Sequence, residues 1–408
     1  MKHIFTFIIT FCIGFGGYFP IHSYINQTKD HEIHVFLEAY ATNPALSQMI
    51  EFAQLPKTTQ KIIAWHRFPH RAKVLDLNDY NTREVDLAAA EGHYSEGTRR
   101  MLVAVHEEIE KNPNAVLVIY ANFNHIPVAV KPFLEKLPKE KIKRIHLFED
   151  GYGELFKWGE EYVNQDIFYA SDLAEQTKTA LMDTSIEWKH WHSFGLRHHY
   201  PITYHFWGAE EMKTLPYMEK FRNSLSDADI RTINFDKLRK TLSNEQKEII
   251  YRLSGFDYQK YNKLMRGKRT FMFVLGYHFN NKDRMNAEEK LLKSLYDGSS
   301  KKLKNPEQYT WFYKPHPSYS AATGLEQIRT AFPNMIEVTA QIPFEVFILA
   351  GLKPTLTAGF SSSLFYSLHN KDILFYVRRP GDKYQPFLTD SGRLKPEQVM
   401  NYNQFLKK

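Results

Sequence analysis

The stretch AVLVIYANFNHIPVAVKPFLEKLPKEKIKRIHLFEDG, residues 115–151, decides the fold class. It opens with an apolar run of strand length at 115–120, continues with a helical pattern at 128–137, and closes with a second expected strand at 144–148. Two strands joined through one helix are expected to be parallel, because a parallel pair needs a crossover connection. Uninterrupted apolar runs are typical of strands buried on both faces. The stretch therefore predicts a parallel sheet with helices on both sides.

The same alternation of strands and helices extends in both directions from this unit. Upstream, strands are expected at 33–38, 61–65 and 73–77, and helices at 44–54 and 97–111. The middle of the chain is helical and charged, with a short strand at 204–206 and helices at 210–224, 235–242 and 243–253. A second alternating run has strands at 269–275, 309–314, 335–338, 355–358 and 373–376, separated by helices at 286–295, 324–332, 344–350 and 362–368. The pattern predicts two Rossmann-like α/β domains.

The length of 408 residues agrees with two to three domains. We expect residues 1–30 to be a signal or membrane-anchor segment. A first Rossmann-like domain is predicted at 31–195, completed by the C-terminal residues 385–408, and a second at 196–384.

The composition excludes several classes of protein. Hydrophobic residues make up 43% and charged residues 24% of the chain, which excludes a disordered, collagen-like or multi-span membrane protein. The net charge of +7 favours anionic partners such as nucleotides. Because the chain has no long Lys/Arg run, this charge does not indicate binding of nucleic acid. The one cysteine, Cys12, lies near the N-terminus, so the folded body has no disulfide, Cys-ligated zinc or thiol nucleophile.

Residues 4–19 are almost entirely apolar and follow Lys2. About 16 apolar residues fall between the core of a signal peptide and a membrane span. An uncleaved anchor and a cleaved signal fit equally well. A lipid anchor on Cys12 fits less well, because Phe11 is large for the position before a lipidated cysteine. A buried core helix is the remaining alternative.

Ligands of Rossmann-like sheets bind beyond the carboxyl ends of the strands, so residues that follow strands are the candidates for chemistry. Glu149, Asp150 and Gly151 follow the strand at 144–148. Partial burial and the neighbouring carboxylate would raise the pKa of Asp150 and suit it to act as a general base. A solvated Asp-Gly turn is the alternative interpretation.

A histidine between two prolines follows the strand at 309–314. Pro315 and Pro317 restrict the backbone and fix the direction of the His316 imidazole. Histidine titrates near neutrality and can donate a proton to a leaving phosphate, and Lys314 adds a positive charge nearby. A surface turn is the alternative.

Two further motifs begin helices. Gly359, Phe360 and three serines at 361–363 form a turn whose amides and hydroxyls can bind a phosphate, unless the serine is only a helix cap. Pro343, Phe344 and Glu345 open another helix. The Glu345 carboxylate can accept from ribose hydroxyls, although acidic residues are common in first turns.

No GxSxG, Walker A, HExxH or GxGxxG motif occurs. Asp227 and Asp229 form an Asp-x-Asp pair of the kind that binds metal in some sugar-transfer enzymes. The pair lies in a polar stretch between helices, so we interpret it as a solvated loop.

The order EDG (149–151), KPHP (314–317) and FSSSLFYSL (360–368) resembles the three short motifs of bacterial sialyltransferases. Longer stretches resemble glycosyltransferase family 80, the Pasteurella and Photobacterium type. They are FLEAYATNPALSQMIEF (36–52), YPITYHFWGAEEM (200–212), LSNEQKEIIYRLSGFD (242–257) and IPFEVFILAGL (342–352). The resemblance covers most of residues 31–380 and implies a GT-B fold, in which two Rossmann-like domains face each other across a deep cleft.

The resemblance also implies roles for individual residues. Asp150 matches the family's general base and His316 its general acid. Substrate-binding roles are implied for Thr42, His125, Gly151, Gly276, Tyr277, Lys314, Pro317, Phe344, Glu345, Ser362 and Ser363. Among these, Ser362 and Ser363 match the phosphate-binding pair, and Lys314 and Glu345 match residues that hold the cytidine.

The chain departs from the family pattern at three positions. Pro315 replaces the usual glycine before the histidine, Phe279 replaces a cleft tryptophan, and Gly153 stands where a larger side chain can face the acceptor. These differences concern the acceptor and the linkage rather than the donor.

The resemblance implies an inverting sialyltransferase that moves sialic acid from CMP-sialic acid to a galactose hydroxyl of a glycan such as lipooligosaccharide. It implies no required metal or other cofactor, no nucleic-acid partner and a monomer. From the N-terminal segment we expect the protein to be membrane-associated at the cell envelope, on either side of the membrane. The alternatives are another CMP-sugar transferase, for example one that uses Kdo, and a glycan-binding protein without turnover.

Overall fold

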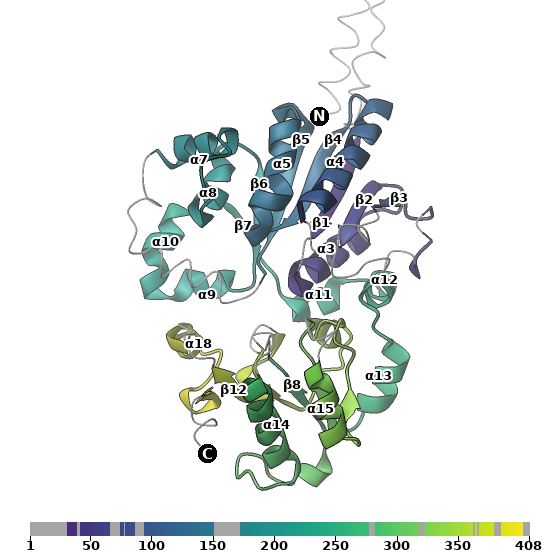
Figure 1. Ribbon diagram of the computed structural model, residues 1–408, viewed down its shortest axis with the longest axis vertical. Coiled ribbons are helices and arrows are strands. Elements are labelled where there is room, and N and C mark those ends of the chain that lie inside the picture. The colour runs from purple at the N-terminus through teal and green to yellow at the C-terminus, as the bar shows by residue number, and fades with distance from the viewer. Residues whose placement is uncertain are drawn as a thin grey trace, which may run out of the picture.

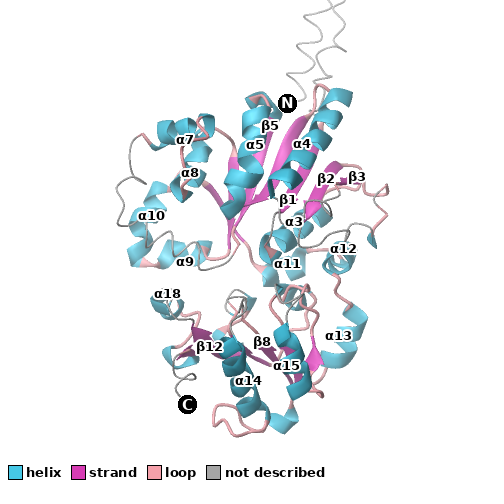
Figure 2. Cartoon of the chain, in the orientation of Figure 1, coloured by secondary structure: helices cyan, strands magenta, loops and turns pink. Residues whose placement is uncertain are grey.

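The structure, a computed structural model, describes residues 31–38, 41–65, 74–76, 78–85, 94–150, 172–276, 282–317, 323–361, 364, 367–378 and 385–402. Within these residues the chain forms a seven-stranded and a six-stranded sheet, each flanked by helices (Figures 1 and 2). All strand pairs are parallel. The predicted α/β class with two parallel sheets is confirmed.

The first sheet has the strand order β3-β2-β1-β4-β5-β6-β7. Its strands are β1 (Glu32–Glu38), β2 (Gln60–Trp65), β3 (Thr82–Glu84), β4 (Val116–Asn122), β5 (Ile142–Phe148), β6 (Ile202–Phe206) and β7 (Asp229–Thr232). The helices around it are α3 (Thr42–Gln54), α4 (Tyr94–Lys111), α5 (Lys131–Lys136), α7 (Leu173–Met182), α8 (His190–Gly195), α9 (Ala209–Thr214) and α10 (Glu219–Ser224). Short turns of helix are η3 (Phe123–His125), the π-helical η4 (Ile126–Val130), η5 (Lys139–Lys141), η7 (Leu196–His198) and η8 (Pro216–Met218).

Three helices connect the two sheets: α11 (Phe235–Thr241), α12 (Asn244–Ser254) and α13 (Tyr258–Met265). Helix α12 begins with a capping box formed by Ser243 and Gln246. The Gln246 amide donates to Ser243 Oγ at 3.1 Å, and the Ser243 amide donates to Gln246 Oε1 at 2.8 Å.

The second sheet has the order β10-β9-β8-β11-β12-β13. Its strands are β8 (Thr270–Val274), β9 (Thr310–Lys314), β10 (Ile336–Glu337), β11 (Leu356–Gly359), β12 (Ile373–Arg378) and β13 (Val399–Asn401). The helices here are α14 (Lys282–Tyr296), α15 (Thr323–Ala331), α16 (Glu345–Leu349) and α18 (Gln385–Asp390), with η9 (Pro306–Gln308), η11 (Asn370–Asp372) and η12 (Pro396–Gln398). Most of the helix expected at 362–368 lies outside the described residues.

Two sequence-based expectations about the first sheet were wrong. The described part of the stretch at 73–77 is not a strand, and the edge of the sheet is instead formed by β3. The second error concerns β7, which contains Asp229 of the supposed solvated loop and pairs with β6. Both edge strands are short and polar, so neither carries the apolar run that marks a central strand.

The predicted division of the chain at 195/196 does not match the sheets. Strands β6 and β7 belong to the first sheet, which therefore continues to Thr232. The C-terminal tail was expected to complete the first domain, but β13 pairs with β12 and extends the second sheet. We call the first sheet with its helices the first body, and the second sheet with its helices the second body. One side chain of the C-terminal tail contacts the first body, because Arg393 forms an ion pair with Glu211 of α9.

One continuous apolar core joins the two bodies. Side chains on β8 alternate between its two faces. Met272 and Val274 belong to the core that includes the strands of the first sheet, whereas Phe271 and Phe273 belong to a second cluster beneath α14. The second sheet is therefore buried on both faces, which explains the uninterrupted apolar sequence of its central strands.

Candidate active site

The first sheet places three of the predicted residues at the carboxyl ends of neighbouring strands. Thr42 begins α3 after β1, His125 ends η3 after β4, and Asp150 follows β5. All three side chains are partly exposed. Because β1, β4 and β5 are adjacent and parallel, these residues lie along one edge of the sheet. Figure 1 shows α3 on the side of this sheet that faces the second body.

Hydrogen bonds hold the backbone around Asp150. The preceding Glu149 is fully buried; its amide donates to the His205 carbonyl at 3.0 Å, and its Oε2 accepts from the Trp207 amide at 3.0 Å. On the other side, Asn43 Nδ2 of α3 donates to the carbonyl of Asp150 at 3.2 Å. The acidic pair therefore has two different functions in the structure. Glu149 joins the ends of β5 and β6, and Asp150 is presented at the sheet edge.

The second sheet brings together Lys314, His316 and Glu345. Lys314 ends β9 and is only 3% exposed, while His316 and Pro317 follow it and are partly exposed. Lys314 Nζ donates to the carbonyls of Pro315 at 2.7 Å and Ala340 at 2.8 Å. Ala340 precedes the segment that leads into α16, whose first residue, Glu345, is 1% exposed.

Burial dominates the electrostatics of this cluster. It lowers the pKa of Lys314 to about 7, and the Glu345 carboxylate opposes that shift only in part. Phe344, which precedes Glu345, is 2% exposed and belongs to the core between the bodies. The partly exposed His316 thus lies two residues from a buried lysine on which a buried carboxylate acts electrostatically.

Glycines occupy two other strand ends in the second sheet. The Gly276 amide, after β8, donates to Glu288 Oε1 of α14 at 2.9 Å. Gly359, the last residue of β11, has φ 143°, and a Cβ at this position would lie 2.0 Å from the Val274 carbonyl oxygen. The close approach of β11 to β8 therefore requires glycine at the start of the Gly/Ser turn.

Several predicted site residues lie outside the described residues. They are Gly151, Tyr277, Ser362 and Ser363, together with Gly153 and Phe279 from the departures noted above. Their roles stay predictions.

Helix α12 connects the two groups of strand-end residues. It contacts α3, which carries Thr42 and Asn43, and it also contacts α16, which carries Glu345. Both α3 and α16 therefore pack against the same connecting helix.

Two residues of this site were missed in the sequence. The sequence does not single out Asn43 as a site residue, because a polar residue that precedes a proline in the first turn of a helix is common. Glu288 could have been noticed, because it shares the buried face of α14 with Leu291, Leu292 and Leu295. A carboxylate on an apolar helical face needs a polar partner, and the Gly276 amide is that partner.

The Asp-x-Asp pair lies in ion pairs with side chains of the first body. Asp227 accepts from Arg197 Nε at 2.9 Å, and Asp229 accepts from Thr203 at 2.7 Å and pairs with Arg144 at 3.2 Å. Among the residues that the structure describes, no group of three or more His, Cys, Asp or Glu side chains could hold a metal ion.

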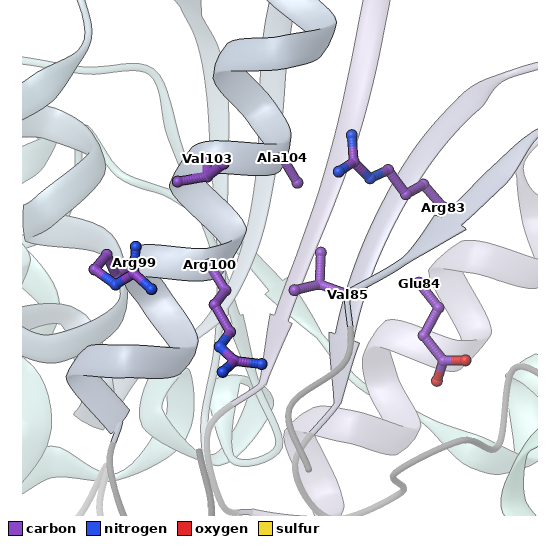
Figure 3. A pocket seen from close by; sticks show the side chains of 7 residues that line it. All are labelled: Arg83, Glu84, Val85, Arg99, Arg100, Val103 and Ala104. Carbon is purple, nitrogen blue, oxygen red and sulfur yellow. The ribbon is translucent and has the colours of Figure 1, made fainter. Parts of the chain in front are cut away.

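A hollow of about 330 Å³ lies between β3 and α4, and none of the candidate site residues lines it (Figure 3). It is lined by Arg83, Glu84, Val85, Arg99, Arg100, Val103 and Ala104. Arg83 pairs with Glu107 at 2.7 Å, and Arg99 and Arg100 pair with Glu96 at 2.7 and 2.9 Å. Because each of these arginines has a carboxylate partner, the hollow does not have the charge of a phosphate site.

The predicted anchor at 1–30 lies outside the described residues. Within the described part of the chain, no helix has the length and hydropathy needed to cross a membrane.

Comparison with solved structures identifies the fold. An α2,3-sialyltransferase from Photobacterium phosphoreum superposes with a TM-score of 0.74 at 20% identity, covering 92% of this chain and 100% of that one. The GT-B domain of a sialyltransferase from Photobacterium damselae gives a TM-score of 0.73 at 19% identity, covering 91% and 99%. A 2,6-sialyltransferase from Photobacterium sp. JT-ISH-224, in complex with CMP and lactose, gives 0.71 at 19% identity, covering 91% and 78%. The fold is that of a GT-B glycosyltransferase.

A family model described as Sialyltransferase PMO188 matches residues 33–385. The chain therefore belongs to this family of sialyltransferases, and the resemblance inferred from its motifs is confirmed. No curated protein matches the chain.

Proposed function

We propose that this protein transfers sialic acid from CMP-sialic acid to a galactose hydroxyl of a glycan, with inversion at the anomeric carbon. The observation that carries the proposal is the placement of Asp150 after β5 of the first sheet and of Lys314 and His316 at the end of β9 of the second sheet, within the span matched by the sialyltransferase family. The solved relative that holds CMP and lactose supports a nucleotide donor and a galactose-terminated acceptor.

In the proposed reaction Asp150 takes the proton of the acceptor hydroxyl. The acceptor oxygen forms a bond to the anomeric carbon, and the bond from that carbon to the phosphate oxygen of CMP breaks. The electron pair remains on the phosphate, where His316 donates a proton or a charge-assisted hydrogen bond. Attack from the face opposite the leaving group inverts the configuration.

The remaining predicted residues would bind the two substrates. Glu345 would accept from the ribose hydroxyls, and Ser362 and Ser363 would contact the phosphate. We infer that the reaction needs no metal, because His316 and the serines can stabilise the leaving phosphate themselves. Activity that is unchanged after treatment with EDTA would support this, whereas loss of activity restored by Mg²⁺ would contradict it.

The natural acceptor that we propose is a surface glycan, lipooligosaccharide in particular, reached by a monomer held at the cell envelope through residues 1–30. A chain that begins at His31 should then be soluble and as active as the full chain on lactose. Loss of folding in the shortened chain would contradict an anchor and place the segment in the core.

The decisive experiment measures CMP release from CMP-sialic acid with and without lactose. A sialyltransferase releases CMP much faster when lactose is present, and the sialylated product shows the linkage and the configuration by NMR. Asp150→Asn should lower transfer by about 10²–10⁴ and leave CMP binding nearly unchanged. A transferase for Kdo would respond to CMP-Kdo instead, and a binding protein would release no CMP, so either result would refute the proposal.

A further inference from the structure

Lys314 is the buried lysine of the candidate site, and its side chain connects two segments of the second body. Its Nζ donates to the carbonyl of Pro315 at 2.7 Å and to the carbonyl of Ala340 at 2.8 Å. Pro315 forms the peptide bond to His316, and Ala340 lies five residues before Glu345. One ammonium therefore holds the histidine turn against the segment that leads into α16.

The charge of this ammonium is costly to bury. Desolvation lowers the pKa of Lys314 to about 7, while the Glu345 carboxylate from α16 favours the charged form. His316, two residues away, is the other titratable group of the same turn. On the neighbouring strands, Glu337 of β10 is already paired with Arg329 at 2.7 Å and accepts from Tyr313 at 2.7 Å. From α14, Glu288 accepts from the Gly276 amide. Of these carboxylates, Glu345 is the one that acts on Lys314.

We propose that Lys314 is a positioning residue that clamps the His316 turn to the Glu345 segment, and that the nucleotide donor binds best when its Nζ is protonated. This inference rests on the proposed function, because it assumes that His316 and Glu345 contact the donor. The direct contact with the nucleotide that the family resemblance implies for Lys314 is not needed for it.

Two physical effects favour the protonated clamp. An ammonium forms charge-assisted hydrogen bonds, which are roughly twice as strong as those of a neutral amine to the same carbonyls. The positive charge also compensates Glu345. A neutral Lys314 removes this compensation and leaves less positive charge beside the anionic nucleotide. Nucleotide binding should therefore raise the pKa of Lys314 and take up a proton near and above neutral pH.

Stability and binding should then depend on pH in opposite directions. The pKa of Lys314 is lower in the folded chain than in the unfolded chain, so between pH 7 and 10 the unfolded state binds more protons. This group makes the empty protein more stable as the pH rises through that range. Nucleotide affinity falls over the same range, which a residue with a merely structural role would not produce.

The test is calorimetric titration of the full chain with CMP at pH 7 and pH 9, in buffers of different ionisation enthalpy. The phosphate of CMP has its second pKa near 6, so it remains a dianion over this range. If binding raises the pKa of Lys314 by about one unit, the affinity at pH 9 is about fivefold weaker than at pH 7, and protons are taken up on binding. Unchanged affinity without proton uptake would overturn the clamp.

Lys314→Met removes the ammonium and keeps the length of the side chain. The matched control is Lys353→Met, which removes a lysine that pairs with Asp372 at 2.7 Å elsewhere in the second body. Lys314→Met should bind CMP about fivefold more weakly at pH 7 and lose the difference between pH 7 and pH 9, and the control should behave as the parent. A Lys314→Met protein that keeps parental affinity overturns the clamp. If that variant does not fold, the two-pH titration of the parent decides.

The two proposals fail in different ways. No binding of CMP by the parent at pH 7 would refute the proposed function and the clamp together. CMP binding and sialyl transfer that do not depend on the charge of Lys314 would refute the clamp alone.

Discussion

Asn43→Leu is the change that most directly tests how the backbone at Asp150, the proposed general base, is held. Asn43 donates through Nδ2 to the Asp150 carbonyl at 3.2 Å, from the first turn of α3 to the end of β5. Leucine has nearly the same shape and cannot donate, so the Asp150 peptide loses its contact with α3. The contact is neutral and partly buried, and such hydrogen bonds contribute about 0.5–1.5 kcal/mol.

If this free energy serves to orient Asp150 in the transition state, kcat should fall by about two- to thirteenfold. The KM for CMP-sialic acid and the affinity for CMP should not change, because this hydrogen bond lies at the first sheet, whereas the residues proposed to hold the cytidine and the phosphate belong to the second sheet. Steady-state kinetics with lactose and CMP titration measure these quantities separately. Gln54→Leu is the matched control, because it removes an amide-to-carbonyl bond of 3.3 Å at the other end of α3.

A second variant, Asn43→Asp, adds a carboxylate near Asp150. A like charge raises the pKa of the base, so the acid limb of the profile of kcat/KM against pH should move to higher pH. The reasoning is refuted if Asn43→Leu and Gln54→Leu have the same kcat, or if Asn43→Asp lowers the rate without moving the acid limb.

Three further predictions follow from the same structure. His316→Ala should lower turnover far more than donor affinity, whereas replacing Ser362 and Ser363 together by Ala should also weaken CMP binding. The effects of the two sets of substitutions should be non-additive, because both sets act on one phosphate. Steady-state kinetics with CMP titration measures these effects, and additive effects would contradict the shared phosphate. Gly359→Ala should lower stability by about 2–4 kcal/mol, because its Cβ would meet the Val274 carbonyl at 2.0 Å in a backbone at φ 143°. Gly267→Ala is the control, since Gly267 also has a positive φ but no atom lies within 4 Å of its Cβ, and equal melting temperatures for the two variants would contradict the close approach. His146 Nδ1 lies 3.0 Å from His205 Nε2, and burial lowers the pKa of both imidazoles, that of His146 to about 3. The unfolded chain therefore binds more protons below pH 6.5, so the free energy of unfolding should fall between pH 6.5 and 4.5, and urea titrations that give equal values at these two pH values would contradict it.

Much of the fold could be predicted because buried parallel strands appear in the sequence as runs of apolar residues. The cores of β4, β8, β9 and β12 are uninterrupted apolar runs, and the capping box at Ser243 marks the start of α12. The rule that ligands bind at the carboxyl ends of strands then selected Asp150, His316 and Glu345 as candidates. These conclusions depend on local sequence alone.

Edge strands and sheet membership could not be predicted in this way. A short polar segment such as Asp229–Thr232 becomes a strand only because β6 offers it hydrogen-bonding groups, and β13 likewise depends on β12. The boundary predicted at 195/196 was too early for the same reason, since the pairing of β6 with β5 joins segments that no local pattern connects.

The sequence by itself determined the α/β class, the central strands and the residue types at their ends. Burial is visible in the spacing of apolar residues along the chain, and the chain direction shows which end of each strand is its carboxyl end. Only the tertiary structure decided what those side chains do to one another. It made Glu149 a buried acceptor for the Trp207 amide, joined Asn43 to Asp150 across 107 residues, and enclosed Lys314 between two carbonyls. Hydrogen bonds and desolvation depend on distance in space, and residues far apart in the chain come within that distance only when the sheets and helices pack.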